Sequence, residues 1–292
     1  MSADIVLSVR GLETEFQTDD GISKVLHGVS FDVKAGQTIG LVGESGSGKS
    51  VTAMSIMGLL PKPYGRVIGG SVNFRGTDLT NLSVNEMHEI RGDRISVIFQ
   101  DPMTALNPVH TIGRQLVEVL KLHRPELSKK EQQNHAIEML RKVKIPMPEK
   151  RFAEYAHNLS GGMRQRVMIA MALACKPDIL ICDEPTTALD VTVQASILEL
   201  MRELQDETGM AMIFITHDLG VVAEICDDVA VMYGGKVVEN ADIFSIFDNP
   251  QHPYTKRLLS LMPNMDDEPK QKIKIAPIDP AEFPEFTGDL GI

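Results

Sequence analysis

The sequence contains the stretch Gly43-Glu44-Ser45-Gly46-Ser47-Gly48-Lys49-Ser50, which satisfies the pattern G-x-x-x-x-G-K-S/T. It follows an apolar run at residues 39–42 and precedes a helix-like stretch that reaches Leu60. Glycines let such a loop curl so that its N–H groups point at phosphate oxygens, Lys49 reaches the terminal phosphates, and the Ser50 hydroxyl can hold Mg²⁺. This strand, loop and helix predict a nucleotide phosphate site that extends to Val51.

Composition sets the first limits on what the chain can be. Its 292 residues allow one large domain or two small ones, with a substantial core. The net charge of −11 weighs against a nucleic-acid partner, because phosphate neutralisation needs clustered Lys and Arg. Cys175, Cys182 and Cys226 each sit among apolar residues. We therefore expect reduced thiols packed in a core and no metal cluster built from them.

The sequence shows no signal for a membrane span or for secretion. The strongest apolar runs, at residues 179–182 and 211–215, have the length of strands, well short of what a bilayer requires. The start Met1-Ser2-Ala3-Asp4 lacks the basic residues and apolar core of a secretory signal. We therefore expect a chain that does not cross the membrane and resides in the cytoplasm.

Apolar runs of strand length alternate with helix-like stretches along most of the chain. The predicted strands cover residues 5–9, 29–33, 39–42, 71–74, 95–99, 179–182 and 212–215. The predicted helices cover residues 51–60, 112–123, 129–144, 163–175 and 191–208. Such alternation favours an α/β fold with a largely parallel sheet and helices on both faces.

Two regions depart from this alternation. Residues 101–160 hold two consecutive helix-like segments, the second opened by a capping box of Ser128 and Glu131, and we interpret them as an inserted helical subdomain. Beyond residue 238 prolines become frequent, which predicts an extended tail. We accordingly place one domain at residues 1–240 and a C-terminal extension at residues 241–292.

Two carboxylates follow the apolar run at residues 179–182. Ligands gather at the carboxyl ends of strands in an open α/β sheet, where Asp183 and Glu184 are expected to lie. Asp183 can hold Mg²⁺ through water, and Glu184, on the opposite side of the extended backbone, can polarise a water aimed at a γ-phosphate. The alternative is an exposed acidic turn ahead of Pro185.

Two further elements are candidate site residues. Ser160-Gly161-Gly162 opens a helix, where it could present a hydroxyl and bare N–H groups to an anion, or be an N-cap followed by a flexible joint. His217 follows the run at residues 213–215 and is predicted at the same sheet edge as the carboxylates. The other histidines we assign to the surface or to satisfied core positions.

The order of these motifs resembles the nucleotide-binding subunit of ATP-binding cassette (ABC) transporters over about residues 4–240. The motifs are residues 43–50, Gln100, residues 159–163, Asp183-Glu184, Asp190 and His217. The resemblance implies a P-loop NTPase with a RecA-like core and a mostly parallel sheet. It also implies an N-terminal antiparallel β subdomain, the inserted α-helical subdomain, and ATP with Mg²⁺ as ligands.

The resemblance also implies roles for single residues. Phe16 resembles the aromatic that stacks on adenine. Gln100 resembles the loop residue that senses Mg²⁺ and the membrane subunit. Glu184 would be the general base, His217 the γ-phosphate switch, and Asp190 an aspartate that communicates across a dimer.

The sequence departs from the family pattern at two of these elements. Met163 stands where glutamine is usual after the two glycines, and Phe16 replaces the commoner tyrosine. We expect function to survive both, because Ser160 and backbone N–H groups bind the anion and phenylalanine keeps the stacking surface. In this family the Ser-Gly-Gly element completes the ATP site of a second subunit, so each chain holds half of two sites.

Three segments resemble the dipeptide/oligopeptide (and nickel) importer branch of the family. They lie at residues 97–108, 159–170 and 249–255. The last contains His252-Pro253-Tyr254-Thr255, which is also typical of a helix start after a turn. Many members of this branch continue into a cysteine-rich segment that ligates an iron–sulfur cluster. No cysteine follows Cys226, so we expect no such cluster.

The branch implies an ATPase subunit that energises peptide import from the cytoplasmic face of the membrane. Its expected partners are a second homologous ATPase, with a heterodimer favoured, two transmembrane permease subunits, and an extracytoplasmic substrate-binding protein. An importer of nickel, glutathione or another small solute shares every site residue and stays open. A soluble cassette ATPase of DNA repair or translation, and a small-molecule kinase, are more distant alternatives.

Overall fold

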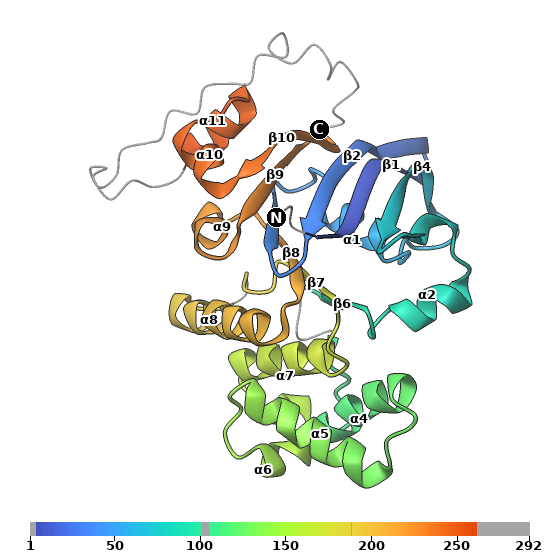
Figure 1. Ribbon diagram of the computed structural model, residues 1–292, viewed down its shortest axis with the longest axis vertical. Helices are drawn as coiled ribbons and strands as arrows, with labels where there is room; N and C mark the ends of the chain where they lie inside the picture. Colours follow the sequence, from blue (N-terminus) through green and yellow to red (C-terminus); the bar gives the residue numbers. More distant parts are fainter. Residues whose placement is uncertain (1–3, 101–104, 188, 262–292) are drawn as a thin grey trace.

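The computed structural model describes residues 4–100, 105–187 and 189–261, which form two sheets and the helices around them (Figure 1). The strands are β1 (Ile5–Thr18), β2 (Gly21–Lys34), β3 (Thr38–Val42), β4 (Gly65–Phe74), β5 (Thr77–Asp78), β6 (Ile95–Ile98), β7 (Ile179–Asp183), β8 (Ala211–Thr216), β9 (Asp228–Tyr233) and β10 (Lys236–Asp242). The helices are α1 (Lys49–Ile56), α2 (Val84–Ile90), α4 (Ile112–His123), α5 (Lys129–Lys142), α6 (Pro148–Phe152), α7 (Gly161–Leu173), α8 (Val191–Thr208), α9 (Leu219–Ile225), α10 (Ile243–Asp248) and α11 (Pro253–Ser260), with short 3₁₀ turns at Leu79–Asn81 and Ala156–Asn158.

The central sheet has the strand order β10-β9-β3-β8-β7-β6. Its strands run parallel except for β10, which pairs antiparallel with β9 at one edge. Every residue of β3 and β8 is buried, as expected for strands covered on both faces. The predicted α/β fold with a mostly parallel sheet is confirmed. Because neighbouring strands run parallel, β3, β7 and β8 end at the same edge.

A second, antiparallel sheet is built from the N-terminal strands in the order β2-β1-β4-β5. The hairpin of β1 and β2 turns at Asp19-Asp20, and its strands are much longer than the predicted runs at residues 5–9 and 29–33. Bulges shift the register along β1, so its buried positions do not alternate regularly and no single apolar run marks the whole strand. The predicted N-terminal antiparallel subdomain is confirmed.

The helices α4, α5 and α6 pack with α7 at one end of the molecule, below the central sheet in Figure 1. Their buried apolar residues belong to the same core as one face of the central sheet. The predicted capping box opens α5, where Ser128 N–H donates to the Glu131 carboxylate at 2.8 Å. The helical insertion is confirmed as a group of packed helices, although residues 101–104 lie outside the described part.

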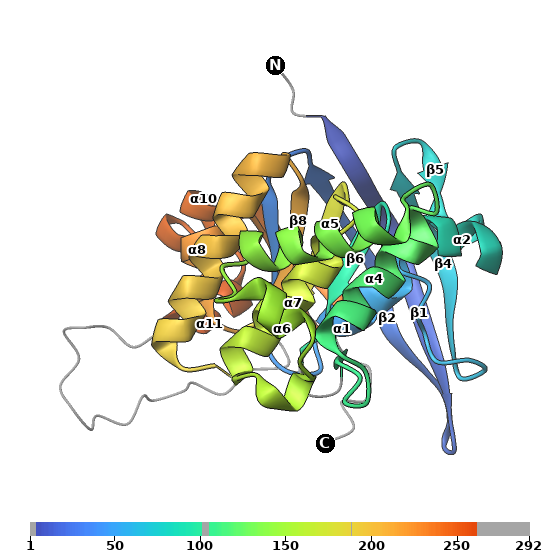
Figure 2. The ribbon, with the colours of Figure 1, turned by 90° about the horizontal axis from the view of Figure 1, so that it is seen from below.

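The C-terminal extension folds back onto the molecule as far as residue 261. The prediction of an extended tail is wrong for residues 243–260, which form α10 and α11. The prolines misled the prediction, because Pro253 occupies the first turn of α11, where the missing N–H costs nothing. Figures 1 and 2 place these two helices on the flank opposite β1, β2 and β4. Residues 262–292 lie outside the described part.

The three cysteines are free and buried, as predicted. Burial raises the pKa of the Cys175 thiol to about 11, so this thiol stays protonated. Among the described helices, none is long and apolar enough to cross a bilayer.

Candidate functional site

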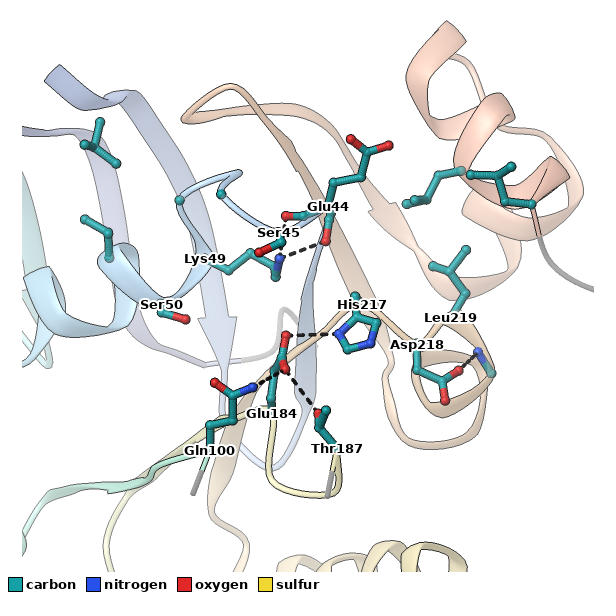
Figure 3. Close-up of a pocket in the computed structure, with 18 residues that line it drawn as sticks. Glu44, Ser45, Lys49, Ser50, Gln100, Glu184, Thr187, His217, Asp218 and Leu219 are labelled. Atoms are coloured by element: carbon teal, nitrogen blue, oxygen red, sulfur yellow. Dashed lines mark hydrogen bonds and ion pairs between the residues drawn. The ribbon is translucent and has the colours of Figure 1, made fainter. Parts of the chain in front are cut away.

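A cavity of about 960 Å³ opens at the edge where β3, β7 and β8 end (Figure 3). Its walls combine the loop that follows β3 with side chains that follow the other two strands. We call it the nucleotide cavity, lined by Val25, Gly43, Glu44, Ser45, Gly46, Gly48, Lys49, Ser50, Val51, Gln100, Glu184, Thr187, His217, Asp218, Leu219, Gly220, Leu258 and Leu261.

The phosphate loop, residues 43–50, joins β3 to α1. A Cβ atom at Gly43 would lie 2.1 Å from the Met232 carbonyl oxygen, so the loop can pass β9 only with glycine there. Gly46 and Gly48 have φ angles of 83° and 100°, a conformation that favours glycine. The sequence pattern is therefore explained by the space and backbone angles that this turn requires.

Lys49 extends along the inner side of the loop. Its ammonium donates to the carbonyl oxygens of Gly43 and Glu44, both at 2.8 Å, and the residue is only 6% exposed. Burial lowers the pKa of Lys49, while the nearby carboxylates, Glu184 first among them, oppose the shift. The cation is thus held on the wall of the cavity among backbone groups.

Ser50 and Asp183 meet across the base of the loop. The Ser50 hydroxyl donates to Asp183 Oδ1 at 3.0 Å, which links the start of α1 to the end of β7. Burial raises the pKa of Asp183, and the neighbouring Glu184 raises it further, whereas Ser50 and Lys49 lower it. An oxygen pair of this kind suits a hard cation such as Mg²⁺.

Glu184 is the centre of the hydrogen-bond network on the cavity floor. Its Oε2 accepts from Gln100 Nε2 at 2.8 Å and from Thr187 Oγ1 at 3.1 Å, and its Oε1 lies 3.0 Å from His217 Nδ1 (Figure 3). Its φ angle of 48° is left-handed, a strain of about 1–3 kcal/mol for a non-glycine residue. The turn after β7 therefore directs this carboxylate toward Gln100 and His217.

Phe16 lies outside the nucleotide cavity. It is half-buried on β1, where a Cβ atom at Gly65 would lie 2.8 Å from its ring. Among the described residues that line the cavity, the N-terminal sheet contributes Val25 of β2. Adenine stacking on Phe16 stays a prediction.

The Ser-Gly-Gly element belongs to a different surface. We call it the Ser160 hollow, a depression of about 420 Å³ lined by Ser160, Gly161, Gly162, Met163, Arg166, Leu189, Asp190, Thr192, Val193 and Ser196. It shares no lining residue with the nucleotide cavity. Ser160 Oγ accepts from Met163 N–H at 3.3 Å and Asp190 accepts from Val193 N–H at 2.9 Å, so each caps a helix. The N-cap at Ser160 is confirmed, whereas the flexible joint and the anion role stay predictions.

The family model for the ABC transporter matches residues 26–187, more than half of the chain. This chain belongs to the ABC transporter family. A second model, the oligopeptide/dipeptide transporter C-terminal region, matches residues 238–288. The family makes the protein an ATPase that binds ATP.

Individual relatives of this ABC ATPase agree with both matches. It is 56% identical over 261 residues to the dipeptide transport ATP-binding protein of Bacillus subtilis, an alignment that covers 89% of this chain and 78% of that protein. It is 51% identical over 273 residues to the oligopeptide transport ATP-binding protein of Escherichia coli, an alignment that covers 94% of this chain and 80% of that protein.

A solved structure supports the fold. The dimeric ATP-binding cassette in a post-hydrolysis state, bound to ADP and Pi, matches with a TM-score of 0.72 and 28% identity. That match covers 81% of this chain and 98% of the other.

The cavity of this ABC ATPase also contains residues that sequence reasoning missed. Thr187 reaches Glu184 from three residues along the same turn, and Val25 and Leu258 come from β2 and α11. A hydroxyl three residues after the carboxylate was the available signal for Thr187. No motif links Val25 or Leu258 to the phosphate loop, because tertiary packing alone brings them there.

Proposed function

We propose that this ABC ATPase energises the import of dipeptides or oligopeptides as a subunit of a membrane transporter. The single observation that carries the substrate class is the match of residues 238–288 to the oligopeptide/dipeptide transporter C-terminal region. The names of the relatives, at 47–56% identity, support it. Binding and hydrolysis of ATP would supply the free energy for transport.

The geometry supports a specific division of labour in hydrolysis. N–H groups of the phosphate loop and the Lys49 ammonium hold the phosphates of ATP. The Glu184 carboxylate takes a proton from a water as that water's oxygen bonds to the γ-phosphorus and the bond to the β-phosphate oxygen breaks. His217, 3.0 Å from Glu184, orients this carboxylate, and the products are ADP and phosphate.

The residues at the base of the loop fit a Mg²⁺ ion. Ser50, Asp183 and Gln100 offer a hydroxyl, a carboxylate and an amide oxygen, which are ligands that Mg²⁺ prefers. When bound, the ion would neutralise charge on the phosphate oxygens. Asp183 keeps Ser50 oriented toward that position through its 3.0 Å hydrogen bond.

The Ser160 hollow supports a composite site shared by two ATPase subunits. In one chain it lies apart from the nucleotide cavity, yet its serine, glycines and helix N-terminus suit a phosphate. We infer that Ser160, Gly161 and Gly162 close over the ATP held by a second, homologous ATPase, with Asp190 beside them. Two transmembrane permease subunits and an extracytoplasmic peptide-binding protein would complete the complex, which places this chain at the cytoplasmic face of the membrane.

Purification of the tagged chain from detergent-solubilised membranes tests the assignment. We expect a second ATPase, two membrane subunits and a binding protein, and ATP hydrolysis that rises when the binding protein is loaded with peptide. Lys49→Ala in the same complex is the control for background hydrolysis. Stimulation by nickel or glutathione in place of peptide would contradict the substrate class, and recovery of DNA or ribosomes would contradict the transporter.

A further inference from the structure

Tyr254 joins the C-terminal extension to the phosphate loop. The residue lies in the first turn of α11, is only 1% exposed, and is one of the largest fully buried side chains of the described part. Its hydroxyl oxygen accepts a hydrogen bond from the backbone N–H of Glu44 at 3.0 Å. The two residues are 210 positions apart in sequence, so this contact depends entirely on how the extension folds back.

The surroundings of Tyr254 fix its ring. The Tyr233 ring, at the end of β9, lies 4.4 Å away between centroids at an interplanar angle of 40°. The Glu239 carboxylate of β10 accepts from the N–H groups of Gln251 and His252 at 2.7 and 2.9 Å, which holds the start of α11. The phenol is therefore placed by the sheet edge and by the helix start together.

The hydrogen bond from Glu44 acts on the peptide unit that also holds Lys49. This unit is planar and contains the Gly43 carbonyl as well as the Glu44 N–H. The Gly43 oxygen accepts from the Lys49 ammonium at 2.8 Å, on the opposite edge of the plane from the N–H. Tyr254 thus fixes the orientation of the group that places the cation.

We propose that Tyr254 is a positioning residue for ATP, which it serves by holding the Gly43–Glu44 peptide and hence the Lys49 ammonium. The inference rests on the proposed role of Lys49 in phosphate binding and is independent of peptide import. Leu258 and Leu261, further along the same segment, line the nucleotide cavity. The C-terminal extension is therefore a wall of the site as well as an anchor for its loop.

The hydroxyl is suited to a constant role. Burial raises the pKa of Tyr254 to about 12, despite the Glu44 N–H, which favours the ionised form. The group is therefore neutral throughout the physiological range, and its contact with the loop does not change with pH there.

Tyr254→Phe in the full-length chain removes the hydroxyl and keeps the ring. We expect the Kd for Mg–ATP and the KM to rise about three- to tenfold, as for one lost hydrogen bond. We expect kcat to stay within about twofold, because the loop grips the phosphates in ground and transition states alike. Tyr155→Phe makes the same chemical change on the exposed surface of the helical insertion and should leave the Kd unchanged.

Thermal unfolding without nucleotide separates positioning from mere packing. A lower Tm with unchanged Kd and KM in Tyr254→Phe would overturn the proposal. An equal rise of the Kd for Mg–ATP in Tyr254→Phe and Tyr155→Phe would overturn it too. If the unaltered chain bound no ATP, the nucleotide assignment itself would fail. Hydrogen exchange of the Glu44 amide in the unaltered chain needs no variant: slow exchange supports the contact, and exchange at the rate of an open loop overturns it.

Discussion

The nucleotide cavity and the Ser160 hollow both present helix N-termini and polar groups, yet they differ in completeness. At the cavity, groups from separate elements meet through hydrogen bonds within one chain: Glu184 with His217, and Ser50 with Asp183. In the hollow, Ser160 and Asp190 each cap the start of a helix, and Arg166 donates to Ser196 at 2.8 Å. The difference supports the proposal that one surface holds and cleaves a nucleotide and that the other contacts a nucleotide held by a second subunit.

The carboxylates of the two regions show the same contrast. Burial raises the pKa of Asp183 in the cavity, whereas hydrogen bonds from Thr192 and Val193 lower the pKa of Asp190 in the hollow. A desolvated carboxylate without its ligand is unfavourable to the fold, and an exposed helix cap is favourable. Asp183 thus lowers the stability of the fold without ligand, whereas Asp190 raises it.

The largest expected effect lies in the cavity. Glu184→Gln should lower ATP hydrolysis by about 100-fold or more, because the amide cannot take the proton from water. The Kd for Mg–ATP should change less than about twofold, since the side chain keeps an oxygen acceptor. Hydrolysis by the assembled complex and equilibrium binding by the purified chain measure the two effects.

Glu203→Gln is the matched control for this change. Glu203 is an exposed carboxylate on α8 that pairs with Lys144 and does not line the cavity. Its replacement should leave hydrolysis unaltered. Hydrolysis by Glu184→Gln at the level of this control would contradict the assignment of the general base.

The pH dependence of stability should have opposite signs at the two carboxylates. The pKa of Asp183 is raised, so the stability linked to it is fully present below its ordinary value of 3.8 and is lost as pH rises through the raised value. The pKa of Asp190 is lowered, so its contribution is present above 3.8 and is lost as pH falls through the lowered value.

Asparagine variants turn this contrast into a measurement. At neutral pH, without nucleotide, Asp183→Asn should raise the Tm, with about 2–4 °C expected for each kcal/mol gained, and Asp190→Asn should lower it. The Asp183 difference should shrink as the pH falls toward 4, whereas the Asp190 difference should shrink only below 3.8, as followed by thermal unfolding over a pH series. Destabilisation by both variants at neutral pH would remove the distinction between the two regions.

The smallest effect is expected at Met163, in the hollow. Met163→Gln keeps the backbone N–H that donates to Ser160 Oγ at 3.3 Å, so hydrolysis by the assembled complex should stay within about twofold. Ser160→Ala removes the acceptor and should cost about 1 kcal/mol of stability as a lost cap. A tenfold change in hydrolysis on Met163→Gln would show that this side chain contacts the nucleotide.

The sequence predicted best where local signals were strong. The predicted helices at residues 112–123 and 191–208 coincide with α4 and α8. Side chains cap the start of each helix, and Gly209 ends α8 in the left-handed conformation. Parallel strands end at one edge of the sheet, and this brings Lys49, Glu184 and His217 together there. Their meeting could therefore be predicted from the parallel sheet.

The sequence could not predict contacts that depend on remote packing. Bulges interrupt the alternation of β1, so its length was underestimated. The prolines of the extension were interpreted as breakers, although Pro253 begins a helix whose Tyr254 reaches Glu44. Phe16 lies outside the cavity lining, and its motif-based role in adenine stacking stays a prediction.

The central claim, that the two regions of one chain serve different nucleotides, is tested most directly by photolabelling the assembled transporter with radioactive 8-azido-ATP. A size tag on this chain distinguishes it on a gel from the partner ATPase, even where that partner is an untagged second copy of the same chain. With Ser160→Arg in this chain, we expect its own label to persist and the label of the partner ATPase to fall; with Lys49→Ala in this chain, we expect the reverse. Loss of label from the Ser160→Arg chain itself, with the partner's label unchanged, would show that Ser160 contacts the nucleotide of its own chain.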